Sequence, residues 1–160
     1  MKLSIIIEEV PSSGQNPDAI MYDAFSGRVF TFNGRTANAT AIDAATDKVV
    51  GTVDIGGKPE FAVTDGKGTI FVNNEDKSEV VAFDAKSLEV KKRWSIAPGE
   101  GPSGLAIDLK GIRLFSVCDN VMVVSAEAPA CYRPRLFHGS RIREISLDPS
   151  AFGKTRTTPV

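Results

Sequence analysis

The sequence predicts an all-β protein built from a repeated four-stranded unit. Pro17, Pro59 and Pro102 open three copies of one pattern, so the period is 42 to 43 residues. In every copy an aspartate follows the proline after six residues and a phenylalanine follows after twelve or thirteen. A period of this length, made of short apolar runs and turn residues, is typical of β-propeller blades. We therefore predict a β-propeller fragment of antiparallel blades that forms an incomplete ring.

Four candidate strands, separated by turn residues, divide each complete copy. Alternation of apolar and polar residues, with many β-branched and aromatic side chains, indicates strands of the usual length. The expected strands are 19–22, 28–33, 39–42 and 48–55 in the blade 17–58, and 61–64, 69–73, 79–83 and 88–96 in the blade 59–101.

The two ends of the chain depart from this repeat. Residues 1–16 are interpreted as the last strand of a preceding blade and its connecting loop. Residues 102–126 form an incomplete blade, with strands expected at 105–107, 113–117 and 121–124. Residues 127–160 lose the alternation and hold the only histidine, His138, with five of the nine arginines. We expect this basic tail to be poorly ordered, either as an irregular extension or as the product of a frame change or truncated reading.

Composition excludes several classes of function. The chain of 160 residues has 19 basic and 20 acidic side chains and a net charge of −1, so no overall field favours nucleic acid or anionic lipid. No apolar run is long enough to predict a membrane span. The apolar start ends at Glu8 and is too short for a signal peptide, so a strand is the simpler interpretation. The two cysteines fit no metal or redox spacing, and the compartment is not predicted.

At its second strands the sequence resembles the YVTN family of β-propeller repeats. The corresponding stretches are 30–33, 71–74 and 115–118, and the Ala-Ile-Asp-Ala and Ala-Phe-Asp-Ala stretches at 41–44 and 82–85 also fit. The literal Tyr-Val-Thr-Asn is absent. The resemblance implies a WD40-like ring of which this chain is a part, in a family that includes surface-layer and exported proteins. It supplies no reaction, because function depends on sites grafted onto the fold.

Aspartates that recur with the period are expected to have a structural role. An aspartate at the start of a turn accepts hydrogen bonds from backbone N–H groups two residues on. Every blade needs such turns, so recurrence favours this role over catalysis. The aspartates concerned are Asp23, Asp65 and Asp108 after the first strands, and Asp43 and Asp84 after the third strands.

Candidate ligand-binding residues are the polar residues of the loops at one end of the blades. In propellers, the loops between strands two and three and the links between blades meet around the central channel. Asp18 and Glu60 are placed to direct two carboxylates into one funnel that binds a cation or cationic ligand, although solvated loop charge is the favoured explanation, because exposed charges are the norm. The candidates are Asn33, Arg35, Lys58, Glu60, Asn74, Glu75 and Glu100.

No catalytic residue, metal ligand or cofactor is predicted. His138 is the only histidine and lies in the tail. Cys118 is explained as a buried apolar residue, and Trp94 as part of an outer strand rich in cations. The leading hypothesis is a non-catalytic binding or scaffold module for a small ligand or protein. The alternatives are a fragment of a propeller lyase or quinoprotein-type oxidoreductase whose catalytic groups lie in other blades, or a truncated copy without independent function. Uncovered blade faces also predict self-association.

Overall fold

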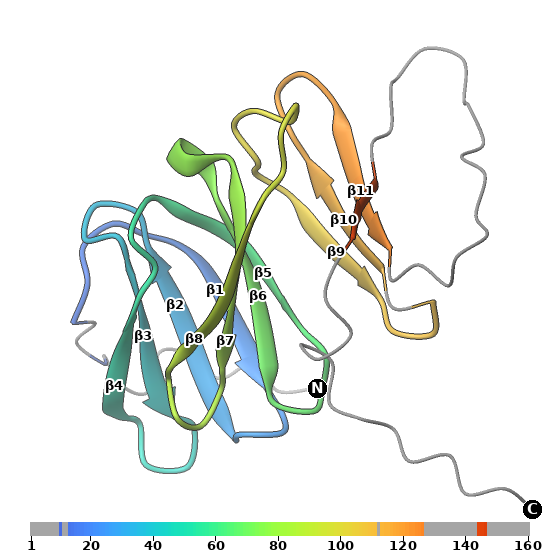
Figure 1. The fold of residues 1–160 in the computed structure, drawn as a ribbon. Helices are drawn as coiled ribbons and strands as arrows, with labels where there is room; N and C mark the ends of the chain where they lie inside the picture. Colours follow the sequence, from blue (N-terminus) through green and yellow to red (C-terminus); the bar gives the residue numbers. More distant parts are fainter. Residues whose placement is uncertain (1–9, 11–12, 112, 127–143, 147–160) are drawn as a thin grey trace, which may run out of the picture.

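Three four-stranded β-sheets make up the described part of the chain (Figure 1). The computed structural model describes residues 10, 13–111, 113–126 and 144–146. Sheet 1 contains the antiparallel strands β1 (Pro17–Asp23), β2 (Arg28–Asn33), β3 (Asn38–Asp43) and β4 (Lys48–Asp54) in sequence order. The predicted all-β propeller fragment is thereby confirmed as the fold class.

Sheet 2 repeats the topology of sheet 1. It contains β5 (Pro59–Thr64), β6 (Thr69–Asn74), β7 (Glu79–Asp84) and β8 (Val90–Ser95), with the short 3-10 helix η1 (Glu75–Lys77) between β6 and β7. Sheet 3 contains β9 (Leu105–Asp108), β10 (Arg113–Val117) and β11 (Met122–Ala126), which are antiparallel. Its fourth member, β12 (Glu144–Ser146), pairs with β11 in parallel.

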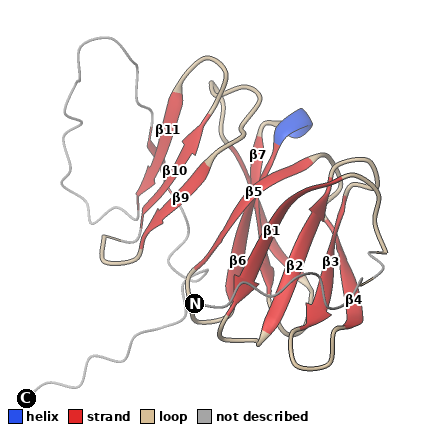
Figure 2. Ribbon diagram, turned by 180° about the vertical axis from the view of Figure 1, so that it is seen from behind, coloured by secondary structure: helices blue, strands red, loops and turns tan. Residues whose placement is uncertain are grey.

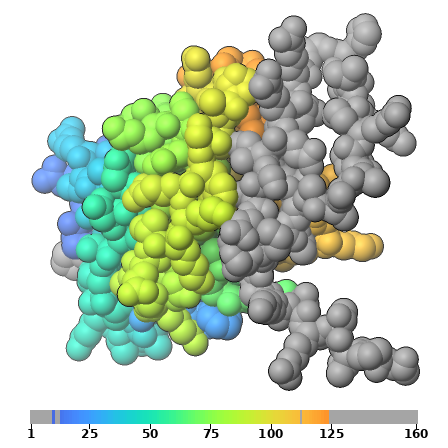
Figure 3. All heavy atoms as spheres, viewed as in Figure 1, coloured from blue at the N-terminus to red at the C-terminus, as the bar shows by residue number. Residues whose placement is uncertain are grey.

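The first strands of the three sheets lie side by side. β5 contacts both β1 and β9, so these strands form the inner edge of the arrangement. Figure 1 shows the outer strands β4 and β8 toward the viewer, and Figure 2 shows β1 and β5 from behind. In the space-filling view of Figure 3, residues of β4 and β8 form adjacent bands of the surface. This is the radial stacking of propeller blades.

Sheets 1 and 2 each have a forward face, which packs on the rear face of the next sheet along the chain. Phe30 and Phe32 on the forward face of sheet 1 are fully buried against Ile70, Val72 and Phe83 on the rear face of sheet 2. The rings of Phe30 and Phe83 meet edge to face, with centroids 5.6 Å apart. Such offset geometry is the favourable one for aromatic pairs.

The second interface uses the corresponding positions. Phe71 and Trp94 on the forward face of sheet 2 pack on Leu105, Leu114 and Val123 on the rear face of sheet 3. Phe71 pairs in its sheet exactly as its counterpart Phe30 does, opposite an alanine of the third strand. The recurring phenylalanine detected in the sequence is therefore the centre of each interface between sheets.

Every strand predicted between residues 17 and 126 is observed, with small shifts at the ends. β8 begins at Val90 rather than at Leu88, because Leu88 has a left-handed backbone (φ 64°) in the preceding turn. β11 runs to Ala126 through Ser125, where the sequence had predicted that the strand ends at Val124. Of the strand predicted over residues 2–10, only Val10 is described, and it is not in a strand. The tail also lies outside the described residues, except for β12. Among the described helices, none is long and apolar enough to cross a membrane.

The predicted structural role of the turn aspartates is confirmed. Asp65 accepts hydrogen bonds from the backbone N–H groups of Lys67 and Thr69 at 2.7 and 2.9 Å. Asp43 and Asp84 cap the turns after β3 and β7 in the same way. These carboxylates are engaged in holding turns at the end of the sheets opposite the candidate site.

Candidate functional site

The loop end of the molecule is the end where the links between sheets and the β2–β3, β6–β7 and β10–β11 loops come together. It comprises residues 13–18, 33–38, 54–60, 74–79, 96–104 and 117–121. All seven candidate residues lie in these segments, but they differ in burial and do not form one surface.

Three of the candidates form a compact charged cluster. The Nζ of Lys58 is 2.8 Å from Oε1 of Glu60 and also contacts the carboxylate of Glu75. Glu75 opens η1, and its backbone N–H donates to the carbonyl of Lys58 at 2.8 Å, so the link between sheets and η1 are fixed to each other. Hydrogen bonds to Glu60 and then to Glu75 raise the pKa of Lys58 above its ordinary value. Lys58 therefore balances only one of the two negative charges of Glu60 and Glu75, and both carboxylates remain partly exposed.

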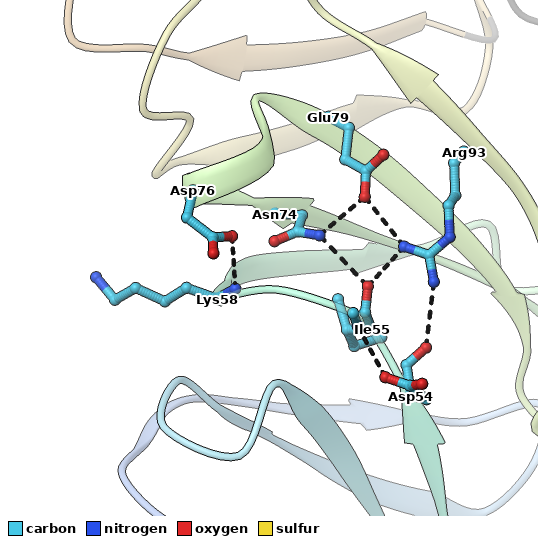
Figure 4. A network of polar contacts seen from close by, with 8 residues as sticks. Asp54, Ile55, Lys58, Asn74, Asp76, Glu79 and Arg93 are labelled. Carbon is cyan, nitrogen blue, oxygen red and sulfur yellow. Dashed lines mark hydrogen bonds and ion pairs between the residues drawn. The ribbon is translucent and has the colours of Figure 1, made fainter.

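Asp76 contacts the backbone of Lys58, the lysine of this cluster (Figure 4). Its carboxylate accepts a hydrogen bond from the backbone N–H of Lys58 at 2.8 Å. Gly57, directly before Lys58, lies so close to Asn74 and Asp76 that an added Cβ would stand 2.3 and 2.4 Å from their Oδ1 atoms. Glycine is therefore required where the link crosses the end of β6.

Asn74 lies beneath the link rather than at the surface. Its Nδ2 donates to the carbonyl of Ile55 at 3.3 Å and to Oε1 of Glu79 at 2.9 Å. Arg93 on β8 donates to the same two acceptors at 2.6 and 3.0 Å, and to the carbonyl of Asp54 at 3.3 Å. Figure 4 shows these groups converging on the chain just after β4. The network ties sheet 1 to sheet 2, which is a structural task.

Asn33 occupies in sheet 1 the place that Asn74 occupies in sheet 2. It is fully buried, and its Nδ2 donates to Asn38 and Thr40 at 2.9 and 3.0 Å. Gly14 packs on it as Gly57 packs on Asn74. Asn33 and Asn74 thus lie under the loops and are not brought onto the surface that carries Lys58.

Arg35 and Glu100 are exposed and stand apart from the cluster. Arg35 lies in the β2–β3 loop, where its backbone N–H donates to the carbonyl of Gln15 at 3.2 Å. The backbone N–H of Glu100 donates to Oδ1 of Asn120 at 3.1 Å, which fixes the link between sheets 2 and 3. Both side chains border the loop end and are available to a large partner.

The two carboxylates predicted to share a funnel are each engaged with a neighbour. Oδ2 of Asp18 accepts from Nδ2 of Asn16 at 2.7 Å, and Glu60 pairs with Lys58. A Cβ on Gly34 would lie 2.8 Å from Oδ2 of Asp18 and 3.4 Å from Cγ of Lys58, so both side chains flank this glycine. Within the described ranges, no group of three or more histidine, cysteine, aspartate or glutamate residues is arranged to hold a metal ion.

Acidic residues outnumber basic ones at the described loop end. Because like charges at this end add their potentials, the excess favours approach of a positively charged partner. The acidic residues are Asp18, Asp54, Glu60, Glu75, Asp76, Glu79, Glu100 and Asp119, and the basic ones are Arg35, Lys58 and Lys77, with Arg93 of β8 next to them.

Cys118 and Trp94 are buried, as the sequence suggested for the cysteine. Burial raises the pKa of the Cys118 thiol, and the hydroxyl of Ser116 lies 4.0 Å from its sulfur. Trp94 packs between sheets 2 and 3, with Nζ of Lys92 5.3 Å from its ring centroid. A ring buried in this way is not presented to a base or sugar.

Comparison with known proteins supports the fold and leaves the family resemblance unconfirmed. The sequence matches no protein-family model, and the comparison with curated proteins gives no match. Among solved structures it is similar to a chain described as Kuenenia stuttgartiensis hydrazine synthase, a propeller-containing protein, with a TM-score of 0.65 and 25% identity. The alignment covers 77% of this chain and 36% of that chain. The chain therefore has a propeller-like fold and spans about a third of the length of the structure it matches.

Proposed function

We propose that this chain is a non-catalytic β-propeller recognition segment that binds a positively charged partner, a ligand or a protein surface, through its loop end. The observation that carries the proposal is the cluster of Lys58, Glu60 and Glu75. Two segments distant in sequence, the link 55–58 and η1, are fixed to each other there by hydrogen bonds. A site whose backbone is fixed before binding loses less conformational freedom when a partner arrives.

The charge of the cluster favours a cationic partner. Glu60 and Glu75 share a single ammonium and stay 23% and 34% exposed, so each keeps oxygen lone pairs for an incoming donor. The surrounding acids add to this negative potential. The sequence resembles YVTN-type propeller repeats, and in propellers loops in this position meet around the central channel.

The experiment compares two variants with the same change in charge at opposite ends of the sheets. Glu60→Gln/Glu75→Gln removes two negative charges at the loop end, and Asp47→Asn/Glu89→Gln removes two from exposed turns at the other end. Binding of a lysine-rich peptide is measured by calorimetry at low and moderate salt. We expect the first variant to lose affinity and the second to retain it. Equal loss in both variants would mean that net charge alone attracts the peptide and would overturn the proposal.

A segment of a propeller enzyme is the alternative, and the similarity to hydrazine synthase is the observation that favours it. In that case the reacting groups would come from parts that this chain does not span. The two proposals separate in the same experiment, because an enzyme segment has no reason to bind a basic peptide through Glu60 and Glu75.

A further inference from the structure

The carboxylates of Glu60 and Glu75 already hold an ammonium group, and it belongs to the chain itself. The Nζ of Lys58 is 2.8 Å from Oε1 of Glu60 and also contacts Oε2 of Glu75. An ammonium carries three N–H donors and a full positive charge, and the hydrogen bonds that it donates to carboxylates are stronger than those between neutral groups. The pair of acids thus accepts a primary ammonium, in this case one supplied from within the chain.

Sheet 1 holds the equivalent link without such an ion pair. Asn16 stands one period before Lys58, and its Nδ2 donates to Oδ2 of Asp18 at 2.7 Å. The carbonyl of Asn16 accepts from the backbone N–H of Gly34 at 2.9 Å, as the carbonyl of Lys58 accepts from that of Glu75. Gly34 has no side chain with which to add a second carboxylate. An ammonium between two carboxylates therefore distinguishes sheet 2 from sheet 1 and is not required to hold a link in place.

The backbone of Lys58 is fixed, whereas its ammonium is held by partly exposed ion pairs. The backbone N–H of Lys58 donates to Asp76 at 2.8 Å, and its carbonyl accepts from Glu75 at 2.8 Å. The side chain is 42% exposed, and ion pairs with such access to water contribute little to stability. A lysine stem has four carbons and is flexible. The ammonium of Lys58 can therefore leave the two carboxylates while the link that carries it stays in place.

We propose, building on the proposed function, that Lys58 is an internal competitor of the cationic partner, and that the ammonium of a partner lysine takes its place between Glu60 and Glu75. The exchange leaves neither carboxylate without a cation. The released ammonium stays within reach of Asp18, because the side chains of Asp18 and Lys58 both flank Gly34.

This competition selects the kind of partner that binds. A partner that offers one ammonium replaces like with like and gains little from the exchange. A lysine-rich segment gains more, because its other ammonium groups interact with the surrounding acids of the loop end while one of them occupies the pair. The internal lysine thus favours segments with several lysines over single amines.

Two variants with the same change in charge test the competition. Lys58→Met removes the ammonium and keeps the apolar stem, and Lys77→Met removes an exposed charge of η1 that is not part of the pair. Binding of the lysine-rich peptide is measured by calorimetry at moderate salt, where charges more than about 8 Å apart are largely screened. We expect Lys58→Met to bind about three to ten times more tightly than the parent, because competition from ion pairs of ordinary strength is removed. Lys77→Met should gain about twofold at most, because its charge acts only through the screened overall field.

A second variant and a combined variant sharpen the test. Lys58→Gln also removes the charge and is expected to gain affinity, so it serves if far-ultraviolet circular dichroism shows that Lys58→Met does not fold. Adding Lys58→Met to Glu60→Gln/Glu75→Gln should give no gain, because the acceptors for which Lys58 competes are no longer charged. Such non-additivity is expected only for groups that interact directly.

The possible results separate this inference from the proposed function. Equal gains in Lys58→Met and Lys77→Met would mean that Lys58 acts through net charge alone, which overturns the inference and leaves the proposed function in place. Weaker binding by Lys58→Met would mean that Lys58 contacts the partner, with the same consequence. A peptide that binds neither the parent nor Lys58→Met would overturn both.

Discussion

The interface between sheets 1 and 2 is predicted to carry much of the stability of the chain, and Phe83→Ala tests this directly. Phe83 is fully buried and its ring meets that of Phe30 at 5.6 Å. Replacing a buried phenylalanine by alanine removes its transfer free energy and leaves a cavity, which together cost about 3–5 kcal/mol. A domain is stable by only about 5–15 kcal/mol, so this one change removes a large share.

The assay is urea unfolding, followed by far-ultraviolet circular dichroism and by the fluorescence of Trp94. Trp94 lies in the other interface, between sheets 2 and 3. The urea midpoints of the two signals should shift together if the sheets unfold as a unit. They should shift separately if each interface between neighbouring sheets is lost on its own. Phe83→Leu, which keeps most of the apolar volume, should cost far less, and it provides a variant that folds if Phe83→Ala does not. Leu109→Ala is the exposed control.

The packing described for sheets 1 and 2 would be refuted by a small effect of Phe83→Ala. A loss below about 1 kcal/mol is the size found for unremarkable substitutions and would place Phe83 outside a well-packed core. A similar loss in Leu109→Ala would show that the assay reports something other than burial.

Three further predictions concern single groups. Burial alone would raise the pKa of Asp84, but hydrogen bonds from Ser87, Lys91 and the turn backbone lower it to about 2. The stabilising contribution of Asp84 is therefore present above about pH 4 and is lost as the pH falls through about 2. In Asp84→Asn the urea midpoint should depend less on pH within that window. Cys118 should react with a disulfide reagent much more slowly in the native chain than in urea, because its thiol is buried and its pKa is raised. Arg93→Met should destabilise the chain by roughly 1–3 kcal/mol in urea unfolding, because the buried carbonyl of Ile55 loses a donor at 2.6 Å, and an unchanged midpoint would contradict the role of this network.

Periodicity predicted most of the fold because each repeat has the same structural requirement at the same position. The phenylalanine of each second strand and the aspartate of each turn recur, and each proves to centre an interface or cap a turn. The parallel strand β12 was outside the reach of this reasoning, because its segment has no counterpart in the other copies.

The candidate site was predicted less completely, and the residues show why. Asn33 and Asn74 were predicted to bind a ligand, although they recur one period apart. The recurrence argument used for the aspartates, applied to them as well, would have indicated the structural task that their buried amides perform. Lys58 and Glu75 have no such recurrence, and the structure brings them together. The part played by Arg93 could not be predicted, because a single sequence does not show which way an outer-strand cation turns.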